Sequence, residues 1–459
     1  MADTTGTTGS RNTAEIAEAI RAATRSNVRG ALAGLISGYQ PMDIAYAMGE
    51  LTSEERSAVF ELLDSQASGV VLEEVDDEIT ADLAEQTEEG ELAEIIDGMP
   101  PDSGADAVNL LPADRKHRIL NRIPLDEARE LESLLHYGHD TAGGLMTSEV
   151  IASPPDVTAL GVLEHIRHTA VQPDASHRVY VVGEDRRLLG AADLLSIINA
   201  RDDQPLLKIM EHDPIAVHPD TDQEEVIRLV DRYDLASLPV VDDQGRLLGA
   251  VTVDDVIDAL QQEATEDIAY IAGASADDLL TRSALRAARG RVPWLLVTLA
   301  ASLLSATVIR LFSGTLEQAV MLAVFIPVIT AMSGNSGLQS SMITVRAIAL
   351  GVIADRRIGA VVLRQVPTAL LVALTCASVA AVAGGLMLHQ TVYGLIVGLA
   401  MFCAMSTGTL MGALVPMVFS RTGIDPALAS GPFVTTLNDA LSLLIYFGIA
   451  VGMIALLGV

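Results

Sequence analysis

The stretch Ser430-Gly-Pro-Phe-Val-Thr-Thr-Leu-Asn-Asp439 decides the organisation of the chain, because it places a carboxylate at the start of the last apolar segment. Roughly 20 residues without a charge follow Asp439, which is typical of a transmembrane helix. A charged side chain at that depth is costly and usually faces a polar partner or an aqueous path. The threonines and Asn438 beside it add neutral oxygens, and oxygen ligands suit a hard cation such as Mg2+ or Ca2+. The sequence therefore predicts an ion site at Asp439; the alternative is a hydrogen bond to a neighbouring helix.

Charge divides the 459 residues into two parts. Residues 291–459 hold four acids and seven arginines, whereas residues 1–290 hold the remaining 56 acids and 22 bases, a net charge of −34. Such an acidic half disfavours nucleic acid and anionic lipid as partners and favours cations. General solubility or adaptation to a salty cytoplasm is the alternative explanation. The two cysteines, Cys376 and Cys403, lie in apolar segments and offer neither a disulfide framework nor a metal-ligand spacing.

The first 140 residues predict a disordered lead-in over residues 1–12 and an all-helical domain over residues 13–140. Thr, Gly and Ser dominate the lead-in, while apolar residues recur every three to four positions in the helical part. A faint repeat, in which residues 43–63 resemble residues 91–111, suggests helix pairs stacked in a short superhelix. Asp102 and Asp106 would share one helix face, either as part of a site or as an ordinary solvated surface.

Residues 141–268 change to an α/β pattern that occurs twice, over residues 146–200 and 210–265. Each copy predicts a short strand, a helix, two strands and a second helix. The elements expected in the second copy are a strand at 213–217, a helix at 221–234 and a hairpin at 237–252. This pattern resembles a tandem pair of CBS domains, a regulatory module that pairs its two halves and can bind adenine nucleotides.

The two copies differ in the residue pair at the positions expected to bind a nucleotide. The second copy has Thr252 and Asp255 at the spacing typical of nucleotide-binding CBS domains, which implies ATP as a ligand. The first copy departs from that pattern and has Asp193 and Ser196 there.

Acids crowd the last helix expected in the second copy. Asp255, Asp258 and Glu266 fall within one stripe of a helix, and Glu263 and Asp267 lie close to it. Like charges at this density repel one another and destabilise a compact assembly. Divalent cations that bridge them would remove the penalty, so compactness would report the cation concentration. An ordinary acidic surface is the alternative.

Residues 269–292 predict a connecting helix beside a membrane. Arginines spaced along residues 282–291 form a basic face directly before Pro293-Trp294. Five apolar segments follow within residues 293–459, near 293–312, 318–345, 359–388, 392–419 and 430–458. Because most flanking arginines fall on one side, the positive-inside rule places residues 1–292 in the cytoplasm and the C-terminus outside the cell membrane.

The second apolar segment carries an unusual run of polar and helix-breaking residues. Pro327, Gly334 and Gly337 permit a kinked or broken helix, which is expected at membrane depth only where it lines a cavity. Asn335 and Gln339, four residues apart, would point along the same face. Helix packing through small residues is the alternative.

Three stretches together resemble the MgtE family of magnesium channels and transporters. They are Pro327 with Gly334-Asn-Ser-Gly-Leu-Gln339, Asp425-Pro426 with Ser430 to Asp439, and Glu263-Ala-Thr-Glu-Asp-Ile268. The similarity covers nearly the whole chain and is most specific in the membrane half. It implies a homodimer in the lipid bilayer of the cell membrane. It also implies a multidomain chain with an all-α superhelical N-domain, α/β tandem CBS domains, a connecting or plug helix, and an α-helical transmembrane pore domain of five spans.

The resemblance also implies roles for individual residues. Asp439 matches the pore aspartate, so two copies would face each other across the dimer axis, with Asn335 and Gln339 lining the same pore. Because Mg2+ loses its waters reluctantly, this ring would bind a hydrated ion. The acids implied as cytoplasmic Mg2+ ligands are Asp102, Asp106, Asp222, Glu224, Asp234, Asp255, Asp258, Glu263, Glu266 and Asp267. Asp425 would contact a gating ion, and Gln365 stands where many members carry Glu.

These features together predict a Mg2+-selective channel for magnesium uptake that closes when cytoplasmic Mg2+ binds between the N- and CBS domains. One alternative is a carrier that exchanges Mg2+, Mn2+ or Co2+ against Na+ or protons. Another is a membrane-anchored sensor of nucleotide or Mg2+. An enzyme is not expected, because the sequence has no nucleophile–base pair, no zinc spacing and no phosphate-binding glycine loop.

Overall fold

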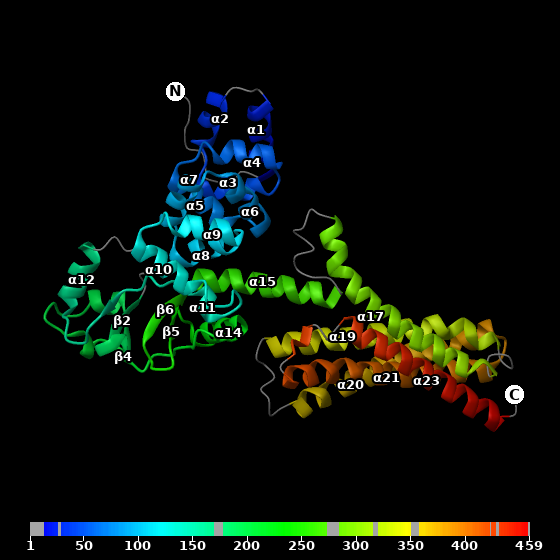
Figure 1. Cartoon of the computed structure of the whole chain (residues 1–459). Coiled ribbons are helices and arrows are strands. Elements are labelled where there is room, and N and C mark those ends of the chain that lie inside the picture. The colour runs from blue at the N-terminus through cyan, green and yellow to red at the C-terminus, as the bar shows by residue number, and fades with distance from the viewer. Residues whose placement is uncertain are drawn as a thin grey trace, which may run out of the picture. The chain divides into compact units, whose positions relative to one another are not determined.

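The computed structural model describes residues 13–25, 29–168, 178–272, 284–314, 320–349, 358–422, 424–427 and 431–457. The lead-in expected over residues 1–12 lies outside these ranges. The chain divides into two compact units, residues 1–260 and residues 261–459, and Figure 1 labels most of their helices and several of their strands. Each unit is described below by itself.

The N-domain consists of short helices that recur with a fixed spacing. They are α1 (Thr13–Arg25), α2 (Arg29–Ile36), α3 (Pro41–Met48), α4 (Ser53–Phe60), α5 (Ser65–Glu74), α6 (Asp77–Gln86), α7 (Glu89–Asp97), α8 (Pro101–Asn109), α9 (Ala113–Leu120) and α10 (Leu125–Leu134). From α3 to α10 the first residues of successive helices are separated by one constant interval. The repeat predicted from the sequence joins α3 and α4 to α7 and α8, so its offset spans two helix pairs rather than one.

Local sequence explains why these helices begin where they do. The Thr52 side chain accepts a hydrogen bond from the backbone N–H of Glu55, and the Glu55 carboxylate accepts one from the backbone N–H of Thr52, which forms a capping box at α4. Asp64 caps α5 by accepting a bond of 2.8 Å from the N–H of Ala67. Pro41 and Pro101 occupy first helical positions, where their missing N–H costs nothing.

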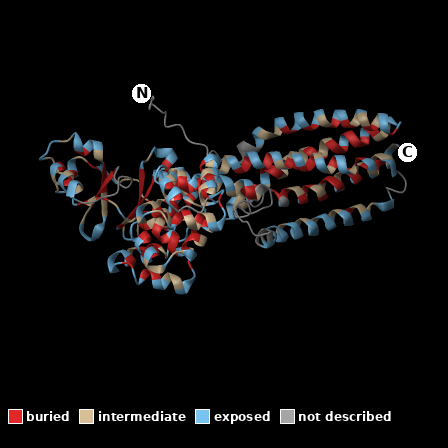
Figure 2. Ribbon diagram, turned by 90° about the horizontal axis from the view of Figure 1, so that it is seen from above, coloured by how far each residue is buried: buried red, intermediate tan, exposed pale blue. Residues whose placement is uncertain are grey.

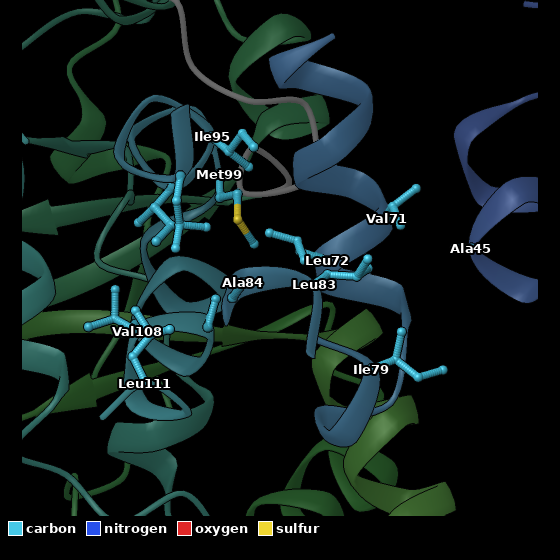
Figure 3. Close-up of a cluster of buried hydrophobic side chains, with 14 of the residues drawn as sticks. Ala45, Val71, Leu72, Ile79, Leu83, Ala84, Ile95, Met99, Val108 and Leu111 are labelled. Atoms are coloured by element: carbon cyan, nitrogen blue, oxygen red, sulfur yellow. The ribbon is translucent and has the colours of Figure 1, made fainter. Parts of the chain in front are cut away.

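The core of the N-domain is built from apolar side chains contributed by successive helices. Val71 and Leu72 of α5, Leu83 of α6, Ile95 of α7 and Val108 of α8 lie in one buried cluster (Figure 3). The same cluster continues into the second CBS copy through buried valines at 226, 240 and 256. The N-domain and the second CBS copy therefore share one hydrophobic core.

Surface side chains of the N-domain follow the same repeat. Hydrogen bonds join residues 29 or 30 positions apart in several consecutive repeats. The pairs are Ser53 with Asp82, Ser65 with Glu94, Ser103 with Glu73, and Arg118 with Glu89. These bonds join α4 to α6, α5 to α7, α5 to α8 and α7 to α9, so helices two or three apart in the sequence are in contact.

Among the described residues, the first CBS copy contains a small mixed sheet with the strand order β1-β2-β3-β4, whose last strand lies after residue 210, within the stretch expected for the second copy. Strand β1 (Ala152–Ser153) is parallel to β2 (Arg178–Val182), and β3 (Leu188–Asp193) runs antiparallel to both β2 and β4 (Glu211–His212). The other elements of this part are α11 (Ala142–Leu145), α12 (Ala159–His168), η2 (Glu184–Arg186), α13 (Leu194–Ile198) and η3 (Leu206–Lys208).

The second CBS copy contains α14 (Gln223–Tyr233), the antiparallel hairpin β5 (Ser237–Val241) and β6 (Leu247–Thr252), and the long helix α15 (Val253–Ala272). These elements agree with the helix and hairpin expected from the sequence. The strand expected at 213–217 is wrong: only Val217 pairs, in a single parallel bridge with Val240. In the hairpin turn Gly245 has a φ of 73°, a conformation that side-chain-bearing residues rarely adopt.

Among its described residues, the second unit contains five helices long and apolar enough to span a membrane, as the sequence predicted. The helical elements are α17 (Ala284–Leu311), η4 (Val320–Phe325) followed by α19 (Ile326–Ala349), α20 (Ile358–Met387), α21 (Thr391–Thr422) and α23 (Pro432–Leu457). Helix α21 is central: 56% of an apolar 18-residue stretch of it is buried, whereas the corresponding share of α17 is 6%. Figure 2 shows buried residues along the inner faces of these helices. The connecting helix expected over residues 269–292 includes residues 273–283, which lie outside the described ranges, and its expected end at residue 292 falls inside α17.

The break expected at Gly334 and Gly337 is not found, because α19 is helical from Ile326 to Ala349. The irregular backbone lies before Pro327, in the 3-10 helix η4. The glycines instead allow close helix packing: a Cβ on Gly337 would lie 2.7 Å from the amide nitrogen of Asn438, and one on Gly412 would overlap the carbonyl of Gly337. Packing through small residues therefore explains this run better than a broken helix does.

Candidate functional site

Asn438 and Asp439 lie where α23 crosses α19 and α21. Asn438 is fully buried, and its Nδ2 donates to the backbone carbonyl of Ser333 at 2.7 Å. The single proton of the Ser333 hydroxyl is shared between the carbonyl of Ala404 at 2.8 Å and Asn438 Oδ1 at 3.2 Å. Three helices are therefore tied together at the level of the membrane carboxylate.

Asp439 is half-buried and lies against the bare backbone of Gly334. A Cβ built on Gly334 would be 3.8 Å from Asp439 Oδ1. The hydroxyls of Thr435 and Thr436 donate to backbone carbonyls of their own helical turn. Among the described residues no Lys, Arg or His forms a salt bridge with Asp439. An intramembrane carboxylate in this setting is chemically suited to a cation.

Helix α19 has two polar faces with different surroundings. Asn335 and Gln339 are exposed on the single chain, as expected for one shared face. Ser340 and Thr344 are buried on another face, where the Ser340 hydroxyl donates to Gln365 Oε1 at 2.6 Å. Gln365 Nε2 in turn lies 3.5 Å from the Thr344 hydroxyl. Gln365 therefore ties α20 to the buried face and does not join the face of Asn335.

In the first unit, α8 and the start of α15 bring carboxylates together. Asp102 Oδ1 is buried and has no hydrogen-bond partner among the described residues. Burial, reinforced by the neighbouring Asp255 carboxylate, raises the pKa of Asp102 to about 7. Burial also raises the pKa of Asp255 to about 6, although the Thr252 hydroxyl donates to its carboxylate. These two desolvated acids repel each other, and a divalent cation would neutralise both.

Glu73 and Glu74 belong to this acidic cluster although the sequence did not single them out. Glu73 Oε1 accepts a hydrogen bond of 2.8 Å from Ser103, the residue after Asp102, and its charge raises the pKa of Asp102 further. Burial, Glu73 and Asp258 raise the pKa of Glu74. The constant spacing between hydrogen-bonded partners would have identified Glu73 as a neighbour of Asp102 once the helix-pair repeat was recognised.

Asp106 lies at the edge of the cluster beside a histidine. Its side chain is 50% exposed, and the Nε2 of His139 lies 4.0 Å from its carboxylate. Burial of the remaining surface raises the pKa of Asp106 to about 6, while His139 lowers it. Because half of the side chain meets water, the effect of burial is smaller here than at Asp102. Burial lowers the pKa of His139, but the carboxylates of Asp106 and Asp140 raise it, and the net shift is upward.

The remaining predicted ligands of the first unit are dispersed. Asp222 caps the start of α14 by accepting a bond of 2.9 Å from the N–H of Glu224, and Asp234 ends the same helix with a φ of 51°. Glu224 is exposed. Asp258 is mostly exposed. Burial of its remaining surface, and then the charge of Asp254, raise the pKa of Asp258. Asp222 and Asp234 therefore have visible helix-capping roles at opposite ends of α14.

The acids predicted at the end of α15 belong to the second unit, together with Asp425. Glu263, Glu266 and Asp267 are half-buried. Burial, followed by repulsion from Asp425 and Glu266, raises the pKa of Asp267 to about 6. Asp425 Oδ1 accepts a bond of 2.7 Å from the N–H of Ala427 in the turn before α23. The second unit thus contains its own acidic pair, Asp267 and Asp425.

Strand register makes the two CBS copies directly comparable at the nucleotide positions. Ser237 pairs with Thr252 in the second copy, and the matching pair in the first copy is Arg178 with Asp193. Arg178 is buried and forms ion pairs of 2.8 Å with both Asp193 and Glu211. The first copy thus has an ion-pair triad where the second has hydroxyl groups.

No group of three or more His, Cys, Asp or Glu side chains among the described residues has the geometry to hold a metal ion by itself. Mg2+ usually keeps several waters and binds proteins through one or two carboxylates. Pairs such as Asp102 with Asp255, and the single Asp439, fit that mode of binding.

Comparisons with known proteins agree with this architecture. Residues 326–449 match the family MgtE, described as a divalent cation transporter, residues 39–140 match the MgtE intracellular N domain, and residues 206–262 match the CBS domain. The matched family models define a transporter of divalent cations that carries an α/β CBS part. The helical N-domain, the CBS pair and the apolar helices predicted from the sequence are confirmed.

Individual relatives identify the family. The magnesium transporter MgtE of Enterococcus faecalis is 36% identical over 324 residues, 71% of each chain, and that of Thermus thermophilus is 37% identical over 330 residues, 70% of this chain and 72% of its own. The chain belongs to the MgtE family of magnesium transporters. A crystal structure of the cytosolic domain of the Mg2+ channel MgtE in complex with ATP is 34% identical, with a TM-score of 0.50, and covers 53% of this chain and 99% of its own.

Proposed function

We propose that this transporter is a Mg2+-selective channel whose pore passes Asp439. The supporting observation is the placement of that carboxylate at the crossing of α19 and α23, beside the bare backbone of Gly334 and without a cationic partner among the described residues. A buried charge in the membrane needs compensation, and a hydrated divalent ion supplies it. Binding through water is weak enough for the ion to leave, as conduction requires.

The proposed pore forms between two copies of the chain. Asn335 and Gln339 expose amide groups on a membrane helix of the single chain. Amides turned toward lipid are costly, whereas amides facing a second copy across a water-filled path are hydrated. A homodimer with Asp439, Asn335 and Gln339 on its axis satisfies them. In this arrangement the N-terminal domains are cytoplasmic and the C-terminus lies outside.

Cytoplasmic Mg2+ closes this channel by binding the acids of the N- and CBS domains. The central ligands are Asp102 and Asp255, assisted by Glu73 and Asp106, because burial and then neighbouring carboxylates raise the pKa of Asp102 and of Asp255. Glu224, Asp222, Asp234 and Asp258 contribute at the surface, and Glu263, Glu266, Asp267 and Asp425 form the corresponding group of the second unit. An ion shifts the equilibrium only if it binds the closed form more tightly, which bridged carboxylates provide.

The second CBS copy is the proposed nucleotide site. Thr252 and Asp255 lie there, whereas the position of the first copy that matches Thr252 is Asp193, which belongs to the Arg178–Asp193–Glu211 ion-pair triad. The ATP complex of the related cytosolic domain supports adenine nucleotide as the ligand class.

Growth of a strain without other magnesium uptake routes tests the pore assignment. The full chain should restore growth at low Mg2+, and Asp439→Ala should not, although it reaches the membrane in equal amount. Single-channel currents through the purified full chain separate a channel from a carrier coupled to Na+ or protons. Rescue by Asp439→Ala would contradict the pore assignment.

Protease resistance of the full chain tests the proposed Mg2+ sensor. Mg2+ should protect the soluble half of the wild type, and Asp102→Asn with Asp255→Asn should abolish that protection and keep the channel open at high Mg2+. A matched control removes two charges at exposed positions of the first CBS copy, Glu184→Gln with Asp185→Asn. Equal protection of the sensor variant and the control would count against the sensor.

A further inference from the structure

The buried amide of Asn438 has a feature that the proposed pore does not use. Asn438 is adjacent to Asp439 on α23 but is itself 0% exposed, so it cannot line an aqueous path in this conformation. A buried amide is costly unless its donor and acceptor are both satisfied. The Ser333 carbonyl accepts from Nδ2 at 2.7 Å, and Oδ1 lies 3.2 Å from the Ser333 hydroxyl, whose single proton it shares with the closer carbonyl of Ala404.

The packing around this amide leaves it a single position. A Cβ on Gly408 would lie 2.5 Å from Asn438 Nδ2, and a Cβ on Gly337 would lie 2.7 Å from the same atom. Glycines of α19 and α21 therefore form the two walls of a slot that fits an amide. The Ser333 hydroxyl extends the contact to the carbonyl of Ala404 on α21 at 2.8 Å. Asn438 is thus held by hydrogen bonds on one side and by backbone on the others.

The consequence for Asp439 follows from helix geometry. Successive side chains on an α-helix are turned by about 100°, so fixing Asn438 fixes the direction of Asp439 as well. With Asn438 in its slot, Asp439 Oδ1 lies beside Gly334. Rotation of α23 about its axis would remove Asn438 from both bonds and would turn Asp439 away from that position.

We infer that Asn438 is a positioning residue that sets the rotation of α23 and so aims the Asp439 carboxylate at the ion path. This inference rests on the proposed function, because it assumes that Asp439 faces water. Asn438 does not contact the ion itself. Its role is to hold one orientation of α23 against α19 and α21.

Thiol labelling tests the orientation directly. The full chain carries Cys376→Ala, Cys403→Ala and Asp439→Cys in liposomes, and the probe is a small cationic methanethiosulfonate reagent. With Asn438 intact, we expect the thiol introduced at position 439 to be labelled rapidly because water reaches it. Asn438→Leu, similar in size but without hydrogen bonds, should slow labelling by about tenfold or more, the effect of losing two buried hydrogen bonds.

Two further variants keep the test decisive. Ser333→Ala removes the hydroxyl bond but leaves the bond from Nδ2 to the backbone carbonyl, so labelling should be slowed to an intermediate degree. Leu437→Ala changes the exposed neighbour on the other side and should leave the labelling rate unchanged. Equal slowing by Leu437→Ala, or unchanged labelling with Asn438→Leu, would overturn the inference.

Uptake kinetics supply an independent measurement with Asp439 intact. A positioning role predicts that Asn438→Leu raises the KM for Mg2+ more than it lowers the maximal rate per folded molecule. A loss of folded protein would instead lower only the total maximal rate and would leave the KM unchanged. An unchanged KM would contradict the role. If Asp439→Cys is not labelled when Asn438 is intact, the proposed pore is contradicted. If it is labelled equally with and without Asn438, only the positioning role of Asn438 is contradicted.

Discussion

The membrane unit and the N-domain with its CBS copies both present carboxylates, but they hold them in opposite ways. Asp439 stands alone among glycines, hydroxyls and an amide, and its direction is set by backbone contacts and one hydrogen-bonded neighbour. Asp102 and Asp255 stand within a group of like charges that includes Glu73. The first arrangement depends on shape, and the second depends on unbalanced charge. This difference suits a fixed ion path in one unit and an ion-dependent switch in the other.

The largest effect should come from disturbing the shape of the membrane unit. A Cβ on Gly412 would overlap the carbonyl of Gly337, so Gly412→Ala should push α21 from α19 and cost about 2–3 kcal/mol of stability. Thermal unfolding of the full chain in detergent measures this loss. Gly448→Ala is the matched control, because nothing lies within 4 Å of its Cβ. Equal stability of both variants would show that the glycine contacts do not set the packing.

The next effect should come from removing a charge in the cytosolic cluster. Asp102→Asn should raise stability without Mg2+ by roughly 1–3 kcal/mol, because it removes a desolvated and repelled carboxylate, and should weaken stabilisation by added Mg2+. The pKa of Asp102 rises on folding from 3.8 to about 7. Its protonated form therefore favours the fold fully below pH 3.8, and this contribution is lost as the pH rises toward 7.

Stability of wild type and Asp102→Asn, measured in a chelator across this pH range, checks the sign. The gap between the two should widen from about pH 4 to about pH 7 and then level off. A gap that narrows over the same range would contradict the charge-repulsion account of this cluster.

A smaller effect should come from one hydrogen bond in the membrane unit. The buried Tyr446 hydroxyl donates to the carbonyl of Leu322 in η4 at 2.6 Å. Tyr446→Phe should cost about 1 kcal/mol, the usual net value of such a bond. Thermal stability in detergent checks it, with Tyr393→Phe as the control for loss of a tyrosine hydroxyl. A cost no larger than that of the control would show that the bond does not anchor η4.

The smallest effect should separate capping from ion binding at Asp222. Asp222→Ala should cost about 1 kcal/mol because α14 loses its cap, whereas Asp222→Asn should cost only a few tenths, since Asn caps equally well. Stabilisation by Mg2+, measured for both variants, shows whether Asp222 also binds the ion. If Asp222→Asn loses much of the Mg2+ response while keeping its basal stability, Asp222 is a ligand as well as a cap; an unchanged response limits it to capping.

Sequence patterns predicted most of what depends on local chemistry. The hairpin at 237–252, the helix α14 and the apolar spans follow from periodicity and composition, and the intramembrane carboxylate is conspicuous because it is alone. The proximity of Asp102 to Asp255 could be expected only through the family resemblance, since these residues lie in different domains and far apart in the sequence. The helix-pair repeat was seen only at twice its length, because short amphipathic helices resemble one another.

Other features depend on helix contacts that a single sequence does not specify. Gly334 and Gly337 are compatible both with a broken helix and with a close crossing of helices. Only the positions of α21 and α23 decide between these two structures. The burial of Asn438 likewise depends on which face of α23 meets α19. Glu73 is one of many surface acids until the superhelical register brings it beside Asp102.

Mg2+ flux into liposomes containing the purified full chain tests the central claim most directly. Asp439→Asn keeps the size and polarity of the side chain but removes the charge. The proposed pore predicts that this variant, inserted in equal amount, shows no Mg2+ flux above that of empty liposomes. Flux equal to that of the wild type would contradict the assignment of Asp439 as the ion site.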